Sequence, residues 1–156
     1  MKKTDHALLK EQLCALSDGV SCGMTVLANA SALLWQSMDA LNWAGFYLMR
    51  GGKLVLGPFQ GKTACTEIAV GRGVCGTAVR TAQTQRVEDV HLFPGHIACD
   101  CASNSEIVVP IRCGDTVIGV LDIDSPVLSR FSEEDQTGLE EFVRTLEPIL
   151  AALPMF

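Results

Sequence analysis

The sequence has little positive charge. Its 12 Lys and Arg residues stand against 18 Asp and Glu residues in 156, which gives a formal net charge of −6, and the basic residues form no cluster. A protein that binds a nucleic-acid duplex needs a basic patch to displace counterions, so we expect no nucleic-acid partner. The chain also lacks the uninterrupted apolar run of roughly 18–20 residues that a membrane span requires. We therefore expect no membrane partner.

The N-terminus lacks the apolar core of a secretion signal. Asp5, His6, Lys10 and Glu11 interrupt the first stretch of the chain, so we expect the protein to stay in the cytoplasm. With 48% hydrophobic and 19% charged residues, the composition is unlike that of disordered chains. The length suits one domain, which we place over residues 1–156.

The spacing of apolar residues predicts an α+β fold. Two helices are expected within the first forty residues, a short helix over 73–82, and a last helix after the N-cap Ser132 that Pro148 should bend or end. Strands are expected over 43–49, 53–56, 65–70, 106–111 and 117–123. Tight turns at Gly51-Gly52 and Gly114-Asp115 predict hairpins, so the sheet should be antiparallel. Residues 83–105 are expected to be mostly loop.

Seven cysteines are many for a chain of this length. In a reducing compartment we expect no structural disulfide framework. Cys14, Cys22 and Cys113 lie in apolar segments, and we interpret them as small packing residues.

Residues 71–76, GRGVCG, match the dinucleotide pattern GxGxxG, but the nearest downstream acids lie closer than the ~20 residues that this site requires. We interpret the glycines as the entry to a short helix. The N-terminus of that helix should lower the pKa of a nearby thiol such as Cys75.

The polar segment 89–105 is the most informative loop, because loops of this length are usually functional. It contains His91, His96, Cys99, Asp100 and Cys101. A zinc site that takes Cys65 or Cys75 as its fourth ligand is one interpretation, but the paired spacing of such sites is missing, and we expect no metal. A buried packing cysteine is another. For Cys99 we favour a reactive thiol, close to imidazole and backbone N–H groups.

Acidic residues occur in the last two predicted strands. Asp122 and Asp124 are two residues apart and should share one strand face, and Glu106 opens the preceding strand. If that face is buried, the like charges should raise the pKa of one carboxyl group, which could then donate a proton. The acids could equally face water at the strand ends. Trp43 and Tyr47 should also share a strand face, either as core residues or as the wall of a ligand pocket.

Several motifs together resemble one known family. They are NWAGFY (42–47), GPFQGK (57–62), ACT (64–66), GVCGTA (73–78), FPGHIACD (93–100), SEIVVP (105–110) and GVLDIDSP (119–126). The set is similar to the free methionine-(R)-sulfoxide reductases, which are enzymes of a single GAF domain. The resemblance covers about residues 10–150. It implies a central antiparallel sheet, with the N- and C-terminal helices on one face and a long active-site loop on the other.

The resemblance also implies residue roles. Cys99 matches the catalytic nucleophile, Cys65 the main resolving cysteine and Cys75 a third cysteine that can join a disulfide. Glu106, Asp122 and Asp124 match the catalytic and substrate-binding carboxylates around the sulfoxide and the amino group, and Trp43 and Tyr47 match the aromatic wall of the substrate site. Cys101 departs from the family pattern, so Cys65, Cys75 and Cys101 all stay open as the residue that resolves Cys99.

The implied activity is the repair of oxidised methionine. Free L-methionine (R)-S-oxide would be reduced to L-methionine through a cysteine sulfenic acid and an intramolecular disulfide, with thioredoxin as the reductant and no cofactor. The family's fold also allows a homodimer through the terminal helices. The alternatives are a non-catalytic GAF sensor of a small ligand and a module whose thiols sense redox state or zinc.

Overall fold

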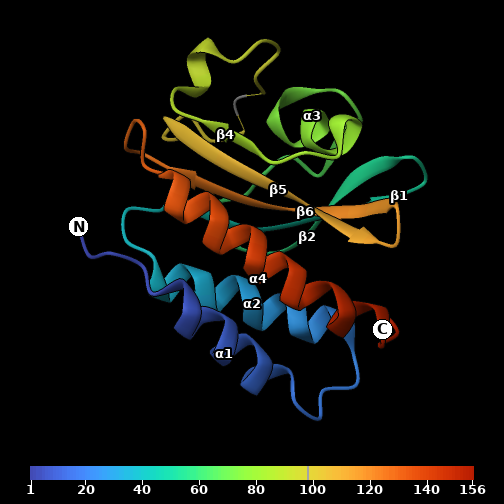
Figure 1. Cartoon of the computed structure of the whole chain (residues 1–156). Helices are drawn as coiled ribbons and strands as arrows, with labels where there is room; N and C mark the ends of the chain where they lie inside the picture. Colours follow the sequence, from blue (N-terminus) through green and yellow to red (C-terminus); the bar gives the residue numbers. More distant parts are fainter. Residues whose placement is uncertain (98) are drawn as a thin grey trace.

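The sheet organises the molecule. The computed structural model describes residues 1–97 and 99–156, and within them six strands form one antiparallel sheet in the order β3-β2-β1-β6-β5-β4 (Figure 1). The strands are β1 Trp43–Arg50, β2 Lys53–Gly61, β3 Glu67–Ala69, β4 Gln85–Val87, β5 Ser105–Cys113 and β6 Thr116–Ser125. The expected hairpins are confirmed, since β1 pairs with β2 and β5 with β6.

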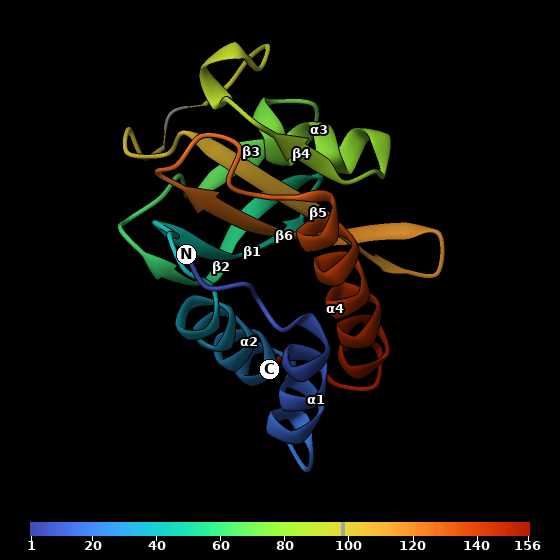
Figure 2. The same ribbon diagram turned by 60° about the vertical axis from the view of Figure 1, so that its left-hand side comes forward.

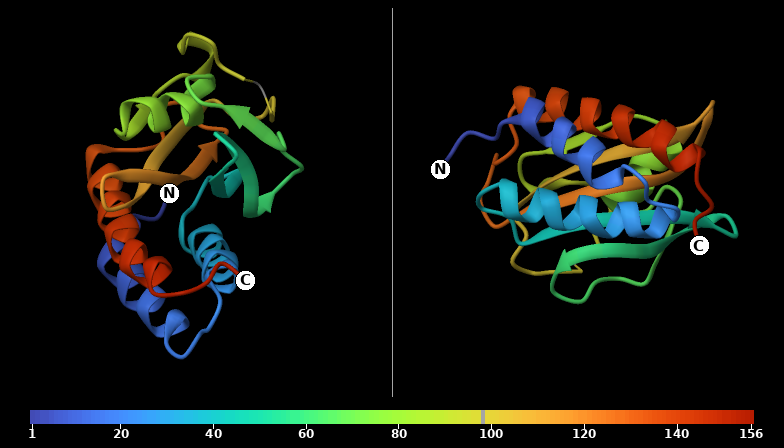
Figure 3. Two further views of the ribbon diagram at one scale, coloured as in Figure 1. Left: turned by 90° about the vertical axis from the view of Figure 1, so that its right-hand side faces the viewer. Right: turned by 90° about the horizontal axis from the view of Figure 1, so that it is seen from below.

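Helices cover both faces of the sheet unequally. Three helices, α1 (His6–Ser17), α2 (Gly23–Ser37) and α4 (Glu133–Ala151), form a layer on one face, and the short α3 (Gly73–Thr81) lies on the other (Figures 1 and 2). The left panel of Figure 3 shows the segment between β4 and β5 on the α3 side. The expected α+β architecture is confirmed. No helix of residues 1–97 and 99–156 combines the length and apolar character of a membrane span.

The alternation of side chains along the strands separates two cores. In β1, Ala44, Phe46 and Leu48 pack against the three helices, whereas Trp43 and Tyr47 belong to a smaller cluster on the α3 side. Successive residues of a strand point to opposite faces of the sheet, so side chains in β5 and β6 also alternate between the three-helix face and the α3 face. Their alternate residues therefore reach the α3 face, and that face carries the acidic residues.

The structure corrects four details of the expected fold. A short strand, β4, and a 3-10 turn, Val90–Leu92, lie inside the segment 83–105. β2 runs on to Gly61. Pro148 lies inside α4, which continues to Ala151. Proline removes only one backbone hydrogen-bond donor. Because Pro148 lies near the end of α4, packing of the apolar face on the core is enough to keep the last turn helical.

The packing role predicted for three cysteines is also wrong in part. Cys14 and Cys113 are exposed, and Cys22 is half-buried, with its thiol donating to the carbonyl oxygen of Met155 at 3.0 Å. Cys14 follows the buried Leu13 on α1, where the buried residues are Leu9 and Leu13. Cys113 lies at the end of β5. An apolar neighbourhood in sequence does not decide which side of an element a residue takes.

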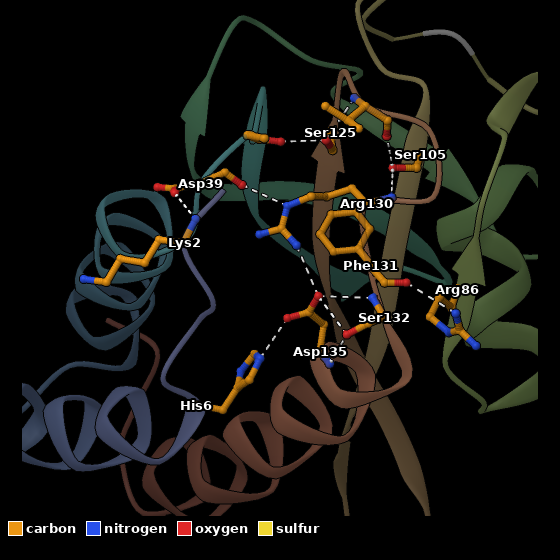
Figure 4. A network of polar contacts seen from close by, with 12 residues as sticks. Lys2, His6, Asp39, Arg86, Ser105, Ser125, Arg130, Phe131, Ser132 and Asp135 are labelled. Atoms are coloured by element: carbon orange, nitrogen blue, oxygen red, sulfur yellow. Dashed lines mark hydrogen bonds and ion pairs between the residues drawn. The ribbon is translucent and has the colours of Figure 1, made fainter.

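A polar network fixes the helical layer to the rest of the chain (Figure 4). The Arg130 guanidinium donates from Nε to the carbonyl of Asp39 at 2.9 Å and from Nη1 to Asp135 at 3.1 Å. His6 Nε2 lies 2.9 Å from Asp135 Oδ1. Ser132 caps α4 as expected, and Asp135 completes a capping box. Burial would raise the pKa of Asp135, but the hydrogen bonds from His6 and Ser132 and the charge of Arg130 lower it to about 2.

Candidate active site

A cavity lies on the α3 face of the sheet, beneath the segment between β4 and β5. Its volume is about 40 Å³. The lining residues include aromatic, acidic, thiol and imidazole side chains: Trp43, Tyr47, Arg72, Cys75, His96, Cys99, Glu106, Asp122 and Asp124. All the predicted site residues except Cys65 are therefore lining residues, and Cys65 contacts this site through its bond to Cys99.

Cys65 and Cys99 form a disulfide. Their Cα atoms are 5.6 Å apart, and 34 positions separate them in sequence. Cys65 lies between β2 and β3, whereas Cys99 lies between β4 and β5, so the bond joins two segments across the cavity. The Tyr47 hydroxyl donates to the Cys65 carbonyl oxygen at 2.9 Å, which fixes the backbone that carries this sulfur. Cys101, in contrast, is an exposed free thiol.

Three carboxylates gather on the cavity wall. Glu106 and Asp124 are directly opposite in the pairing of β5 with β6, and Asp122 follows two residues along the same face. Glu106 is 7% and Asp122 6% exposed, and Asp124 is half-buried. The alternative that these acids face water is therefore wrong. One oxygen each of Asp122 and Asp124 is buried without a hydrogen-bond partner among the described residues.

Burial and mutual repulsion raise the pKa of these carboxyl groups. Burial raises the pKa of Glu106, and the charges of Asp122 and Asp124 raise it further. The pKa of Asp124 is raised by burial and by Asp122, against a hydrogen bond from Ser103. Burial also raises the pKa of Asp122, although hydrogen bonds from Glu106 and Cys75 oppose it. The predicted upward shift is confirmed in direction, so the cavity wall can supply a proton.

Cys75 is a buried thiol beside these acids. Its Sγ lies 3.3 Å from Asp122 Oδ2 and 4.0 Å from Glu106 Oε1. Burial raises the pKa of Cys75 well above its ordinary value, and the negative charges of Asp122 and Glu106 add to the effect. The prediction that the N-terminus of α3 lowers this pKa is therefore wrong, because two neighbouring carboxyl groups and the loss of water outweigh a helix dipole.

Two aromatic rings lie beside the acids on the same face of the sheet, where Trp43 of β1 pairs with Asp124 of β6. The rings of Trp43 and Tyr47 are stacked, with centroids 5.7 Å apart and an angle of 22° between their planes. Phe59 stacks on the other side of Trp43 at 5.1 Å. The Trp43 indole N–H donates to the carbonyl oxygen of Lys62 at 3.2 Å. Both rings are buried and their polar atoms are satisfied by the segment before β3, so they present a fixed apolar surface to the cavity.

Residues that the sequence did not single out also shape the site. The Asn42 amide donates to Asp100 Oδ2 at 3.0 Å and to Ser103 Oγ at 2.9 Å. These bonds tie the segment that carries Cys99 to the start of β1. Arg72 lines the cavity from the start of α3. Asn42, Arg72 and Asp100 all occur in segments that the sequence analysis quoted, but no role was predicted for Asn42 or Arg72, and Ser103 gave no signal.

The zinc interpretation of the loop finds no support in the geometry. The rings of His91 and His96 are 6.4 Å apart, and the sulfur of Cys99 is bonded to Cys65. His91 pairs with Asp89 at 2.8 Å. Within the part of the chain that the structure describes, metal-ligating atoms come within 4.8 Å of one another in one group, Cys75, Glu106 and Asp122.

Comparisons with known proteins agree with this fold and site. The profile of the GAF domain matches residues 8–149, which gives the class of protein. Among relatives, "Free methionine-R-sulfoxide reductase" of Escherichia coli is 57% identical, over 97% of this chain and 92% of that protein. The protein of the same name from Saccharomyces cerevisiae is 47% identical, over 84% of this chain and 77% of that one. The chain therefore belongs to the free methionine-R-sulfoxide reductase family of GAF-domain proteins.

Solved structures of this family superimpose closely. The reduced form of fRMsr of Staphylococcus aureus is 50% identical and matches with a TM-score of 0.92, over 96% of this chain and 97% of that one. A free methionine-R-sulfoxide reductase from Neisseria meningitidis, solved in complex with its substrate, is 40% identical with a TM-score of 0.91, over 97% of this chain and 93% of that one. The expected GAF-like fold is confirmed by these matches.

Proposed function

We propose that this chain reduces free L-methionine (R)-S-oxide to L-methionine. Two observations support the activity: relatives across most of the chain carry the name of this reductase, and a sulfur lies in a cavity lined by buried carboxyl groups whose pKa values are raised. The observation that carries the proposal is the Cys65–Cys99 disulfide beside Glu106, Asp122 and Asp124, because sulfoxide reduction by thiols ends in such a bond.

Cys99 is the proposed nucleophile. In the reduced protein its thiolate attacks the sulfoxide sulfur, while a protonated carboxyl group among Glu106, Asp122 and Asp124 donates to the oxygen. The oxygen passes to Cys99, methionine leaves as the thioether, and Cys99 becomes a sulfenic acid. The Cys65 thiol then attacks the Cys99 sulfur, a disulfide forms and water is released. A dithiol protein such as thioredoxin reduces that disulfide by exchange and is itself oxidised.

The cavity fits a free amino acid better than a residue within a peptide. An ammonium group can pair with the ionised member of the carboxylate cluster, whereas a peptide nitrogen is neutral. Arg72 lines the same cavity and can bind the α-carboxylate of a free amino acid. A methionine sulfoxide residue inside a peptide has no free α-carboxylate. Trp43 and Tyr47 provide the apolar wall for the S-methyl end.

The disulfide-bonded form is the proposed product state. Its cavity of about 40 Å³ has room for a few water molecules and not for an amino acid, because a buried water needs roughly 10–15 Å³ by this measure. Reduction of the bond frees the segment that carries Cys99 and would enlarge the cavity for the next substrate.

The decisive test is NADPH oxidation coupled through thioredoxin and its reductase, with each epimer of free methionine sulfoxide offered separately. We expect turnover with the R epimer, no turnover with the S epimer, and none in Cys99→Ser. Cys113→Ser, which changes an exposed cysteine away from the cavity, is the matched control and should keep full activity. Binding of the R epimer without methionine release by the wild-type protein would favour the sensor alternative.

A further inference from the structure

The buried group of Cys75, Glu106 and Asp122 has the geometry of a metal-binding site. Their ligand atoms lie within 4.8 Å of one another, and all three residues are buried. Cys75 Sγ is 3.3 Å from Asp122 Oδ2 and 4.0 Å from Glu106 Oε1. In a tetrahedral zinc site with bonds of about 2.3 Å to sulfur and 2.0–2.2 Å to oxygen, a sulfur and an oxygen ligand lie roughly 3.5 Å apart. A cation could thus be bound with side-chain shifts of about half an ångström.

A second observation points to a missing ligand. Asp122 is 6% exposed, yet its Oδ1 is buried with no hydrogen-bond partner among the described residues. A buried carboxylate oxygen without a donor is costly, and structures usually satisfy it with a proton donor, a water or an ion. Asp122 also lines the cavity, so a cation bound there could take a water from the cavity as its fourth ligand.

The donor set favours zinc over the common hard cations. One thiolate and two carboxylates carry three negative charges, and a divalent cation offsets two of them. Sulfur ligands select borderline or soft metals such as Zn²⁺, whereas Mg²⁺ and Ca²⁺ prefer oxygen ligands alone. The disulfide does not involve Cys75, so its thiol is available in both redox states of the Cys65–Cys99 pair.

We propose that Cys75, Glu106 and Asp122 form a binding site for Zn²⁺, and that the bound ion excludes the substrate. The exclusion rests on the proposed function, since Glu106 and Asp122 are there assigned to the sulfoxide and the ammonium. The ion is therefore a reversible inhibitor, because it occupies two side chains that the substrate would contact. This role is distinct from that of a metal cofactor.

Cobalt substitution tests the site without any measurement of activity. The background is a variant in which Cys14, Cys22, Cys101 and Cys113 are changed to Ser and the Cys65–Cys99 bond is left oxidised. Cys75 is then the only thiol. We expect one Co²⁺ per chain, a near-ultraviolet band from sulfur-to-cobalt charge transfer, and displacement by one equivalent of Zn²⁺. Absence of the band in this background would overturn the proposal.

Two further variants identify the ligands. Cys75→Ser should abolish the band, and Glu106→Gln should weaken Co²⁺ binding at least about tenfold while it keeps the thiol. If Cys75→Ser does not fold, Glu106→Gln decides alone: unchanged affinity contradicts the proposed ligand set. A band that persists in folded Cys75→Ser would also contradict it. The control Glu147→Gln, on α4 beside Arg112, should bind Co²⁺ as the background does.

Inhibition is measured on the wild-type protein. We expect Zn²⁺ to raise the apparent KM for the R-sulfoxide at unchanged kcat, and a chelator to restore the rate. If the wild-type protein does not turn over the sulfoxide but binds Co²⁺ through sulfur, the proposed function fails and the metal site stands. If it turns over and shows no sulfur band, only the metal site is refuted.

Discussion

Asp124→Asn should weaken catalysis and stabilise the protein at the same time. Asp124 faces Glu106 across β5 and β6, and its Oδ1 is buried without a hydrogen-bond partner in residues 1–97 and 99–156. In the proposed function the three carboxyl groups bind the ammonium and the sulfoxide of the substrate. Removing one of them should therefore relieve repulsion in the free protein and remove an ion pair from the complex.

The loss in catalysis follows from the buried ion pair. Truncating one partner of a desolvated charge pair costs about 2–5 kcal/mol, which is at least a 30-fold or so fall in kcat/KM. Because the ammonium is paired in both ground and transition states, most of the loss should be a rise in KM. Steady-state rates with the R epimer measure it, with Asp115→Asn in the exposed β5–β6 turn as the control.

The gain in stability depends on pH. Burial and Asp122 raise the pKa of Asp124 in the folded protein. The unfolded chain therefore releases this proton at a lower pH than the folded chain, so stability falls as pH rises from the unfolded pKa through the folded one. Replacement by Asn removes that penalty, which is on the order of 1–3 kcal/mol for a poorly satisfied buried group.

Urea unfolding of the disulfide-bonded protein at pH 4 and pH 8 tests the sign. Asp124→Asn should be more stable than the wild-type protein at pH 8 and nearly equal to it at pH 4. Asp115→Asn should match the wild-type protein at both. A variant that is destabilised at pH 8 with an unchanged KM would refute both the crowding of the carboxyl groups and the ammonium site.

Three other changes have expected outcomes. Cys65→Ala should slow thioredoxin-coupled turnover far more than methionine release in a single turnover, and equal losses would argue against a resolving role. Asp135→Asn should lose ~2 kcal/mol of unfolding free energy at pH 7, because the pKa of Asp135 is about 2 when folded against an ordinary 3.8; the difference should disappear as pH falls from 4 towards 2. Gly76→Ala should lower stability by about 1–3 kcal/mol, since a Cβ there would lie 2.5 Å from the Ala69 carbonyl oxygen. A thermal melt that leaves the Gly76 variant unchanged would contradict that clash.

The sequence predicted the helices and strands in which apolar residues recur at a regular spacing. Helices α1, α2 and α4 bury one regular face, and the alternation of side chains along the strands placed Asp122 and Asp124 on the same side. The short β4 was missed because two of its three residues are polar and the strand gains its structure from pairing with β5. A segment of that length carries no period of its own.

The site was predicted as a list of residues and not as a geometry. The match to known motifs selected Cys65, Cys99 and the three acids, but only the fold shows that Cys75 lies against Asp122 and takes no part in the disulfide. The pKa of Cys75 was predicted in the wrong direction for the same reason. Local sequence shows the helix that begins beside this thiol, whereas the carboxyl groups that decide its pKa come from strands far along the chain.

A single turnover of the reduced protein tests whether Cys99 is the nucleophile and Cys65 its disulfide partner. Reduced wild-type protein is mixed with one equivalent of free methionine R-sulfoxide, and released methionine and the new disulfide are determined by mass spectrometry. We expect one methionine per chain and a bond between Cys65 and Cys99. Failure to form methionine, or methionine formation that leaves Cys99 a free thiol, would contradict this reaction at Cys99.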